Sequence, residues 1–431
     1  MKLWGYPRDV WAWSLYDWAN SAFILSVASA FFPAFFKGYW GSGLSSTQST
    51  VALGYGNAIA GLVVAVSSPI LGAFADVGRA KKAFLTFCML LGSLSTAGLF
   101  FAGKGVWIPA LSLFVLGRVG FSLANLFYDS LITDVARPEQ ADMVSSLGYS
   151  VGYLGCGLMF AGNIVMYRNP SWFGLPSDTE AVRVVFLLVA AWWIVFTIPL
   201  WLYVHQRTPG SRRGIGEIVR RGFADVPATA RSIAACPDAL LFLIAYWCYI
   251  DGVHTVYLMA IDFGLSLGLP FGVLMVALLL VQFVAFVFAL ASGALAGRIG
   301  GKKTILAAIG VYVVVVSGGA WILRTAAHFI FFACLTGVAQ GAIQALSRSF
   351  FAKLIPEDRS AEYFGFYNLV GKFAVVLGPA VVASANLLGT RVGLDGREAS
   401  RFGISTLVVL FLAGGFLLYR VNPSPIPARP D

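Results

Sequence analysis

Long runs of apolar residues, separated by short polar segments, form the main pattern along this chain. A helix needs about 20 apolar residues to cross a bilayer, and twelve runs reach that length. The pattern therefore predicts an all-α integral membrane protein with twelve transmembrane helices. The first run contains Asp17 and Asn20, is too long for a cleavable signal peptide and is followed at once by another run. We expect spans at about 11–36, 51–75, 83–102, 106–133, 143–167, 183–204, 237–262, 270–297, 302–324, 327–352, 363–388 and 400–420.

The composition agrees with this pattern. Of the 431 residues, 58% are hydrophobic and 12% are charged, and the mean hydropathy is +0.80. A soluble domain carries about 25% charged residues. This chain therefore has too few charged residues to cover the surface of a water-soluble protein. Its net charge of +10 is explained by topology and by attraction to anionic lipid headgroups, and we expect no nucleic-acid partner.

The basic residues predict the orientation in the membrane. Lys and Arg collect in cytoplasmic loops, and most basic residues of the connecting segments fall on the side of the N-terminus. Clusters on that side include Arg79, Lys81 and Lys82 in one loop, and Arg212 and Arg213 in another. We therefore expect an even number of spans with both termini in the cytoplasm.

A short loop segment occurs twice in related form. Residues 72–82 read GAFADVGRAKK, and residues 293–303 read GALAGRIGGKK. Each copy lies between two apolar runs, and each has small residues, a tight turn and a lysine pair. The recurrence predicts two pseudo-symmetric six-helix halves, an arrangement common among secondary transporters. We expect an N-terminal bundle at 1–204, a cytoplasmic linker at 205–236 and a C-terminal bundle at 237–431.

The predicted linker contains a helical pattern of apolar residues. A helix on the inner membrane surface would explain this pattern and the basic residues within it. A solvated basic linker is the alternative. The apolar positions are Ile215, Ile218, Val219, Phe223 and Val226, and the basic ones are Arg220, Arg221 and Arg231.

Twelve spans, two halves and the repeated loop resemble the major facilitator superfamily. Gly72, Asp76, Gly78, Lys81 and Lys82 fit its signature between spans two and three. The second copy departs from that signature, because Gly297 stands where an Asp is expected. The resemblance implies the major facilitator fold and a gating role for Asp76, Lys81 and Lys82, in which they lock the cytoplasmic side of the outward-facing state. We also assign Arg348, in the tenth span, to gating. A positively charged stop signal with no gating role is the alternative.

A closer resemblance covers most of the chain. Matching stretches are 16–23 (YDWANSAF), 148–155 (GYSVGYLG), Trp192-Trp193, 249–255 (YIDGVHT) and 341–379. Together they resemble the bacterial branch of the "unknown major facilitator" family, which is related to the fungal vacuolar amino-acid effluxers of autophagy. The resemblance implies a secondary active transporter that moves a small polar solute by alternating access. Efflux of an amino acid or small peptide is the activity that it favours.

Polar residues inside the spans are the candidates for substrate binding and coupling. A charge at the bilayer centre costs about 2.5–3.5 kcal/mol, so such residues are usually functional or paired. Most of them fall in spans one, four, seven and ten, which line the central cavity in the superfamily that this chain resembles. The candidates are Asp17, Asn20, Arg118, Asn125 and Asp129 in the first half, and Asp251, His254, Gln340, Gln344, Asn368 and Lys372 in the second.

The candidates suit a zwitterionic solute. Residues three apart share a helix face, so Asp17 and Asn20, like Asp251 and His254, can present two polar groups to one place. Arg118 offers a bidentate fork for a carboxylate. Lys372 offers a point charge, although Asp251 and Lys372 can equally neutralise each other as a structural pair.

The same residues allow proton coupling. Histidine titrates near physiological pH, and a buried carboxyl such as Asp17, Asp129 or Asp251 can also carry a proton. A buried histidine is more often a hydrogen-bonded packing residue, so both interpretations of His254 stay open. Sodium coupling and uncoupled exchange stay open as well.

Several functions lack the residues that they need. The three histidines are scattered, the five cysteines show no close pairing and no Walker loop is present, so we expect no metal, no cofactor and no enzyme activity. A sugar or drug carrier of the same fold is the first alternative, and a membrane sensor or lipid-modifying enzyme is the second. The lack of Asn-x-Ser/Thr acceptor sites and the short loops favour a bacterial inner membrane. We expect a monomer.

Overall fold

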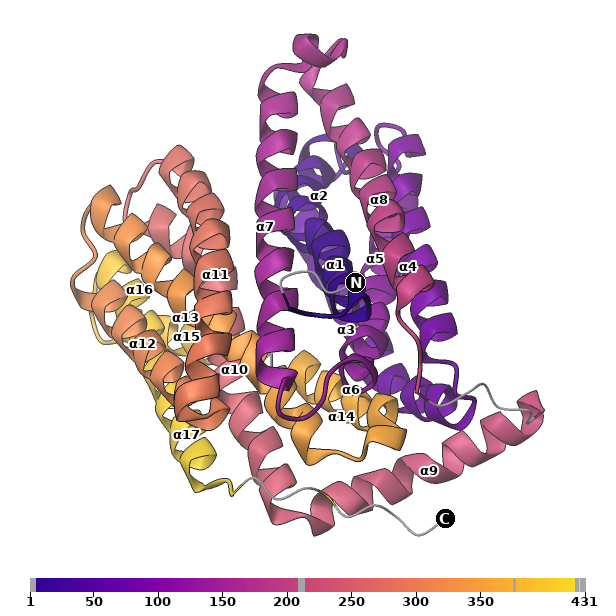
Figure 1. Cartoon of the computed structure of the whole chain (residues 1–431). Helices are drawn as coiled ribbons and strands as arrows, with labels where there is room; N and C mark the ends of the chain where they lie inside the picture. Colours follow the sequence, from indigo (N-terminus) through magenta and orange to yellow (C-terminus); the bar gives the residue numbers. More distant parts are fainter. Residues whose placement is uncertain (1–4, 208–213, 375–376, 423–425, 427–431) are drawn as a thin grey trace. The chain divides into compact units, whose positions relative to one another are not determined.

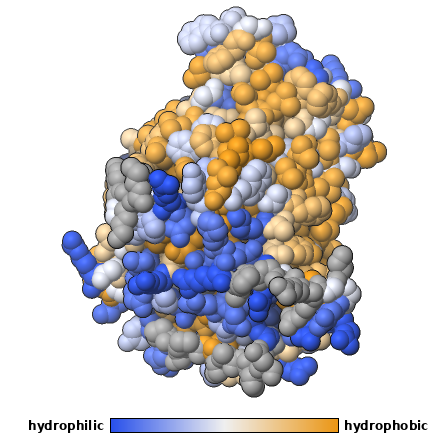
Figure 2. Space-filling view, turned by 45° about the vertical axis from the view of Figure 1, so that its right-hand side comes forward, coloured by the Kyte–Doolittle hydropathy of each residue, from blue (hydrophilic) through white to orange (hydrophobic). Residues whose placement is uncertain are grey.

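A computed structural model describes residues 5–207, 214–374, 377–422 and 426 of the chain (Figure 1). Within these residues, 12 helical segments are long and apolar enough to cross a membrane. Each of them overlaps one predicted span, so the twelve predicted spans are confirmed. Figure 2 shows broad areas of hydrophobic residues on the molecular surface, as expected for a protein whose helices face lipid.

The helices of the first half follow the predicted order. The first span is assembled from α1 (Arg8–Ala22), η1 (Phe23–Phe31), α2 (Phe32–Phe35) and η2 (Phe36–Trp40). The others are α3 (Ser46–Val77), α4 (Lys81–Gly98) with η3 (Leu99–Phe101), α5 (Trp107–Ser130) with α6 (Ile132–Val135), α7 (Ala141–Arg168) and α8 (Asp178–Tyr203), and η4 (Pro170–Phe173) lies between the last two.

The second half repeats this order after a connecting helix, α9 (Ile215–Ala235). Two of its spans are each built from two consecutive helices. Its elements are α10 (Pro237–Ser266), α11 (Phe271–Ile299), α12 (Gly301–Trp321), α13 (Ala326–Leu354), η5 (Glu357–Arg359), α14 (Ser360–Phe373), α15 (Leu377–Arg391), α16 (Gly396–Ser405) and α17 (Leu407–Arg420).

Side chains fix the beginnings of several helices. Ser45 and Gln48 form a reciprocal capping box at the start of α3, and Asp395 and Glu398 form another at α16. The Thr325 hydroxyl accepts the N–H of His328 at the start of α13. These groups satisfy N–H donors that a helix leaves unpaired in its first turn. His328 is thereby part of a capped helix end.

The first span changes its helical form after Ala22. The segments η1 and η2 are π-helical, a form that usually occurs as short bulges near functional sites. The phenyl rings of Phe32 and Phe114 stack with their centroids 3.8 Å apart, which packs this span against α5. Asp17 and Asn20 lie in the regular α-helical part, directly before the wider segment.

The chain forms two compact units. Unit 1 contains Met1–Ala136, Val151–Val226 and Asp358–Gly365, and unit 2 contains Arg137–Ser150, Pro227–Glu357 and Phe366–Asp431. The beginning of α7 thus belongs to unit 2, and the beginning of α14 belongs to unit 1. Helix α9 divides between the units at Pro227. The predicted bundles at 1–204 and 237–431, with a linker at 205–236, remain a prediction.

The linker contains a long helix, as expected. Part of the apolar face of α9 packs in unit 1 on the end of α3, where the Phe74 and Phe223 ring centroids lie 5.3 Å apart. Phe223 remains 55% exposed. Contact with a membrane surface is still a prediction. Arg212 and Arg213 of the linker lie outside the described residues.

Candidate functional site

The first copy of the repeated loop holds a buried lysine in unit 1. Lys81 is 4% exposed, and its Nζ donates to Asp134 Oδ2 at 3.0 Å and to Ser360 Oγ at 2.6 Å. The same Nζ lies 3.9 Å from Asp76 Oδ1. Asp76 Oδ2 in turn accepts the backbone N–H of Glu362 at 2.7 Å. The loop and the end of the fourth span thereby hold the first turn of α14.

A glycine makes this contact possible. A Cβ atom added to Gly72 would lie 2.3 Å from the carbonyl oxygen of Ala361, so the backbones of α3 and α14 meet directly. The first glycine of the second copy does the same in unit 2. A Cβ atom on Gly293 would lie 2.7 Å from Cβ of Ser146, in α7. In each unit the repeated loop therefore contacts the first turns of a helix from the other half of the sequence.

The second cluster of polar groups surrounds Asp142 in unit 2. The Ser349 hydroxyl donates to Asp142 Oδ1 at 2.7 Å, and Lys353 Nζ lies 2.7 Å from Asp142 Oδ2. Both partners come from the end of α13. In unit 1 the loop supplies the cation, whereas in unit 2 the tenth span supplies it.

Arg348 joins the same two helices, α13 and α7. It is 1% exposed, and its Nε donates to Ser145 Oγ at 2.8 Å while Nη2 donates to the Ser145 carbonyl at 3.0 Å. Its guanidinium carbon lies 4.2 Å from the centroid of the Tyr149 ring. A buried cation over an aromatic face gains energy beyond that of its hydrogen bonds. The position is compatible with the gating role that we assign to Arg348.

Lys82 has a different environment from its neighbour Lys81. Its Nζ donates to the carbonyl oxygens of Trp201 and Val204 at 3.0 and 2.6 Å, at the end of α8. Lys302 makes the matching contacts with the carbonyls of Tyr419 and Val421 at the end of α17. A lysine at the last carbonyls of a helix satisfies unpaired acceptors and the helix dipole. Lys82 thus corresponds structurally to Lys302, although the aligned loops pair it with Lys303.

Sequence reasoning missed several members of the two clusters. A second repeat in the sequence could have indicated Asp142 and Glu362. The loops before α7 and α14 each contain Pro-Glu, followed a few residues later by an alanine and an acidic residue. The pairs are Ala141-Asp142 and Ala361-Glu362. The residues missed are Asp134, Asp142, Ser145, Ser349, Lys353, Ser360 and Glu362.

We expect Gly72→Ala to disturb both stability and transport. The added methyl group meets a backbone carbonyl that cannot move alone, and such overpacking costs about 1–3 kcal/mol. Thermal denaturation in detergent and transport in proteoliposomes measure the two effects. Gly61→Ala is the matched control in α3, because nothing lies within 4 Å of the Cβ position there. Equal melting temperatures for the two variants would contradict the close approach.

The candidate substrate residues of the first half lie in unit 1, on α1 and α5. The Tyr128 hydroxyl donates to Asp17 Oδ2 at 2.8 Å, and Asn20 Nδ2 donates to Asn125 Oδ1. The Tyr128 ring stacks on Trp13 with centroids 4.5 Å apart. Two hydrogen bonds thereby join α1 to α5, and three of the four side chains in them were singled out from the sequence. Asp129 follows Tyr128 near the end of α5 and is partly buried.

Arg118 lies on the same helix, α5, but its side chain has different surroundings from those of Asn125 and Tyr128. It is partly buried, and its guanidinium carbon lies 5.9 Å from the centroid of the Phe114 ring. Among the described residues no carboxylate lies within salt-bridge distance of it. An intramembrane arginine without a carboxylate partner is costly, which makes Arg118 a candidate ligand for an anionic group.

The candidates of the second half lie in unit 2, on α10, α13 and α14. Asp251 Oδ2 accepts the N–H of Gly378 in the first turn of α15 at 2.8 Å, and Thr255 lies 3.5 Å from Oδ1. Within the described residues, Nδ1 of His254 and Oε1 of Gln340 are buried without a hydrogen-bond partner. Gln344 lies on α13, and Asn368 and Lys372 lie on α14.

Asp251 contacts the first turn of α15, and two variants test whether this contact stabilises the helix. As a cap it stabilises the helix, and its loss in Asp251→Ala should cost about 1 kcal/mol. Asp251→Asn retains an acceptor oxygen and should melt close to the unaltered protein. A thermal scan of both variants tests the capping role. If the two variants melt alike, the contact with Gly378 does not stabilise the helix.

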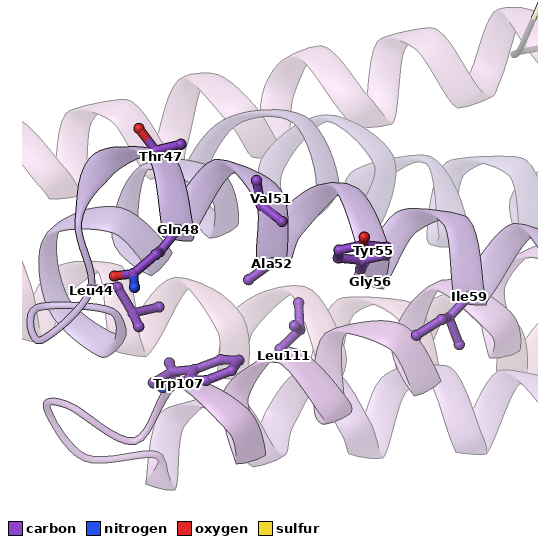
Figure 3. A pocket seen from close by; sticks show the side chains of 10 residues that line it. All are labelled: Leu44, Thr47, Gln48, Val51, Ala52, Tyr55, Gly56, Ile59, Trp107 and Leu111. Atoms are coloured by element: carbon purple, nitrogen blue, oxygen red, sulfur yellow. The ribbon is translucent and has the colours of Figure 1, made fainter.

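A further pocket in unit 1 is lined by none of these residues. It has a volume of about 510 Å³, and its lining comes from the segment before α3 and the first turns of α3 and α5 (Figure 3). Trp107 and Leu111 of α5 face Gln48 and Ala52 of α3 across it. No predicted substrate residue lines it. In the described part of the chain, no group of three or more His, Cys, Asp or Glu residues could hold a metal ion.

Comparisons with known proteins agree with the fold. The family model "Vacuole effluxer Atg22 like" matches residues 38–424. The chain is 38% identical over 410 residues to the "Uncharacterized MFS-type transporter YxiO" of Bacillus subtilis, with 94% of this chain and 93% of that protein covered. It is 24% identical over 451 residues to "Autophagy-related protein 22" of Coccidioides immitis, with 85% and 72% covered.

Solved structures of transporters share the fold. The proton:xylose symporter XylE gives a TM-score of 0.71 at 13% identity, with 97% of both chains covered. The human organic anion transporter MFSD10 gives 0.67 at 18% identity, with 95% of this chain and 98% of that chain covered. At these identities the likeness shows the fold alone. With the family model, it establishes that this chain belongs to the Atg22-like family of major facilitator transporters.

Proposed function

We propose that this transporter exports an amino acid or a small peptide. The observation that carries the proposal is Arg118, which lies inside a membrane span without a described carboxylate partner. A guanidinium binds a carboxylate through two parallel hydrogen bonds. The α-carboxylate that every amino acid and peptide carries would supply the missing partner. Export is favoured by the family description, which names an effluxer.

The amino group of such a solute needs hydrogen-bond acceptors. Asp17, on α1, and the joined pair Asn20 and Asn125 supply oxygen atoms in unit 1, the unit that also holds Arg118. An ammonium group leaving water must keep its hydrogen bonds, or its transfer becomes costly. These residues therefore suit the cationic end of a zwitterion, and Arg118 suits the anionic end.

We propose that the two polar clusters are gates on the cytoplasmic side. Asp76 and Lys81 would hold the start of α14, and Arg348 with Asp142 would hold the start of α7. Alternating access requires helices from the two sequence halves to separate on one side in turn. These contacts would then break and re-form once in each cycle. For Lys82, a role in capping α8 has more support than a gating role.

Proton coupling is the mechanism that we favour for this transport. His254, Asp17, Asp129 and Asp251 are the candidate carriers, and the buried Nδ1 of His254 has no described partner that would hold its tautomer. A proton gradient imposed on proteoliposomes should then drive substrate movement. Movement that ignores the gradient would exclude this coupling.

We further propose a monomer in the bacterial inner membrane with both termini in the cytoplasm. This topology is supported by the basic residues of the loop that contains Arg79, Lys81 and Lys82. Cysteine labelling from either side of the membrane at introduced positions tests it directly.

A thermal-shift screen in detergent tests the solute class. The panel contains amino acids, dipeptides, sugars and nucleosides, each at pH 5.5 and 7.5. A ligand that binds only the folded protein raises its apparent stability, so an amino acid or dipeptide should raise the melting temperature. A shift with sugars or nucleosides alone would overturn the proposed solute class and leave the fold unaffected.

A further inference from the structure

An apolar groove runs between three helices of unit 2. Helix α10 lines it with Leu240, Leu243, Ile244 and Trp247, and α14 lines it with Phe366, Leu369, Val370 and Phe373. Both sets have the spacing i, i+3, i+4, i+7, which places them on one face of each helix. Ala230 and Ile233 of α9 also line the groove. Three apolar faces therefore meet without filling the space between them.

The groove is open to the surroundings. Its volume is about 310 Å³, and Leu240, Ile244 and Phe373 are 39%, 41% and 54% exposed. One turn of an α-helix with a diameter of about 10 Å and a pitch of 5.4 Å fills roughly 420 Å³. The groove volume is thus smaller than that of one helical turn, and its apolar lining suits a hydrocarbon chain.

Charged residues of α9 and α10 lie close in sequence to the residues that line this groove. Arg231 is exposed and directly follows the lining residue Ala230 on α9. The nearby Asp238 carboxylate, in the first turn of α10, accepts the N–H of Asn422. A hydrocarbon-lined groove with a neighbouring cation matches a molecule with an apolar tail and an anionic head.

The position of α9 favours a lipid as that molecule. This helix lies outside the twelve candidate spans and meets α10 at its first turns (Figure 1). An amphipathic helix at the end of a span lies at the boundary of headgroups and acyl chains, where basic side chains attract anionic lipids. We propose that one anionic phospholipid occupies this groove, with an acyl chain against α10 and α14 and its phosphate at Arg231.

Native mass spectrometry of the detergent-purified full chain tests the proposal. Phosphatidylglycerol and phosphatidylcholine with identical acyl chains are titrated separately. One phosphatidylglycerol should bind about fivefold more tightly than phosphatidylcholine, the factor expected for one basic side chain at an anionic headgroup. Arg231→Gln should remove this preference. Arg220→Gln is the matched control, because Arg220 is exposed on the same helix but belongs to unit 1.

A second variant tests the hydrocarbon part of the site. Ile244→Asp places a charge among the lining residues and should reduce retention of both lipids, because an acyl chain cannot solvate a carboxylate. Equal binding of the two lipids by the unaltered protein would overturn the proposal. Equal losses in the Arg231 and Arg220 variants would do so too, since they indicate general attraction to the helix. If Ile244→Asp does not fold, the Arg231 comparison still decides, because that residue lies on the surface.

Discussion

Lys81→Met should be among the most destabilising single substitutions in this protein. The buried Nζ stands between the carboxylates of Asp134 and Asp76 and also binds Ser360. Its removal leaves two carboxylates close together without their cation. Breaking a buried ion pair from one side costs about 3–5 kcal/mol. Thermal denaturation in detergent should show a markedly lower melting temperature, and transport should be lost with it.

The second copy of the loop supplies the control for this prediction. Lys303→Met removes an exposed lysine from the equivalent loop and should change stability by less than about 0.5 kcal/mol. Asp134→Asn added to Lys81→Met should restore part of the stability, because it removes one of the two unpaired charges. A Lys81→Met protein that melts like the Lys303→Met protein would show that the lysine does not hold these helices together.

Arg118→Gln should abolish tight binding of the solute while leaving the fold intact. A hydrogen bond to a charged group contributes about 1.5–3 kcal/mol, so substrate affinity should fall roughly 10- to 100-fold. The melting temperature without ligand should stay the same or rise, since the change removes an intramembrane charge that has no described carboxylate partner. Ligand-induced thermal shifts measure the affinity, and scans without ligand measure the stability.

Two further variants separate recognition of a carboxylate from a general effect of charge. Arg118→Lys keeps the positive charge but loses the bidentate fork, and it should bind with intermediate affinity. Arg183→Gln removes an arginine of α8 that already pairs with Glu180 at 2.6 Å, so solute affinity should not change. Full affinity in the Arg118→Gln protein would remove the observation on which the proposed solute class rests.

The number and order of the spans were predictable because bilayer crossing imposes a simple rule on composition. The roles of Lys81 and Lys82 were not. The two lysines are adjacent and chemically identical, yet successive side chains on a helix point about 100° apart. One lysine therefore enters a buried cluster with Asp134, while the other reaches the carbonyls of Trp201 and Val204. Only the positions of neighbouring helices distinguish them.

The contacts of Asp251 show another limit of sequence reasoning. A polar residue in the seventh span suggests substrate binding, but the sequence does not show that its carboxylate meets the N–H of Gly378. Gly378 is 127 positions from Asp251 in the sequence, and hydrophobic periodicity does not encode contacts between residues so far apart.

Counterflow in proteoliposomes tests the proposed transport of amino acids or small peptides most directly. Vesicles that contain the purified protein are loaded with an unlabelled amino acid or dipeptide and diluted into a trace of the labelled compound. The proposal predicts transient accumulation of label that is absent from empty vesicles and from vesicles with the Arg118→Gln protein. Counterflow of a sugar or a lipophilic drug, with none for any amino acid or peptide, would contradict it.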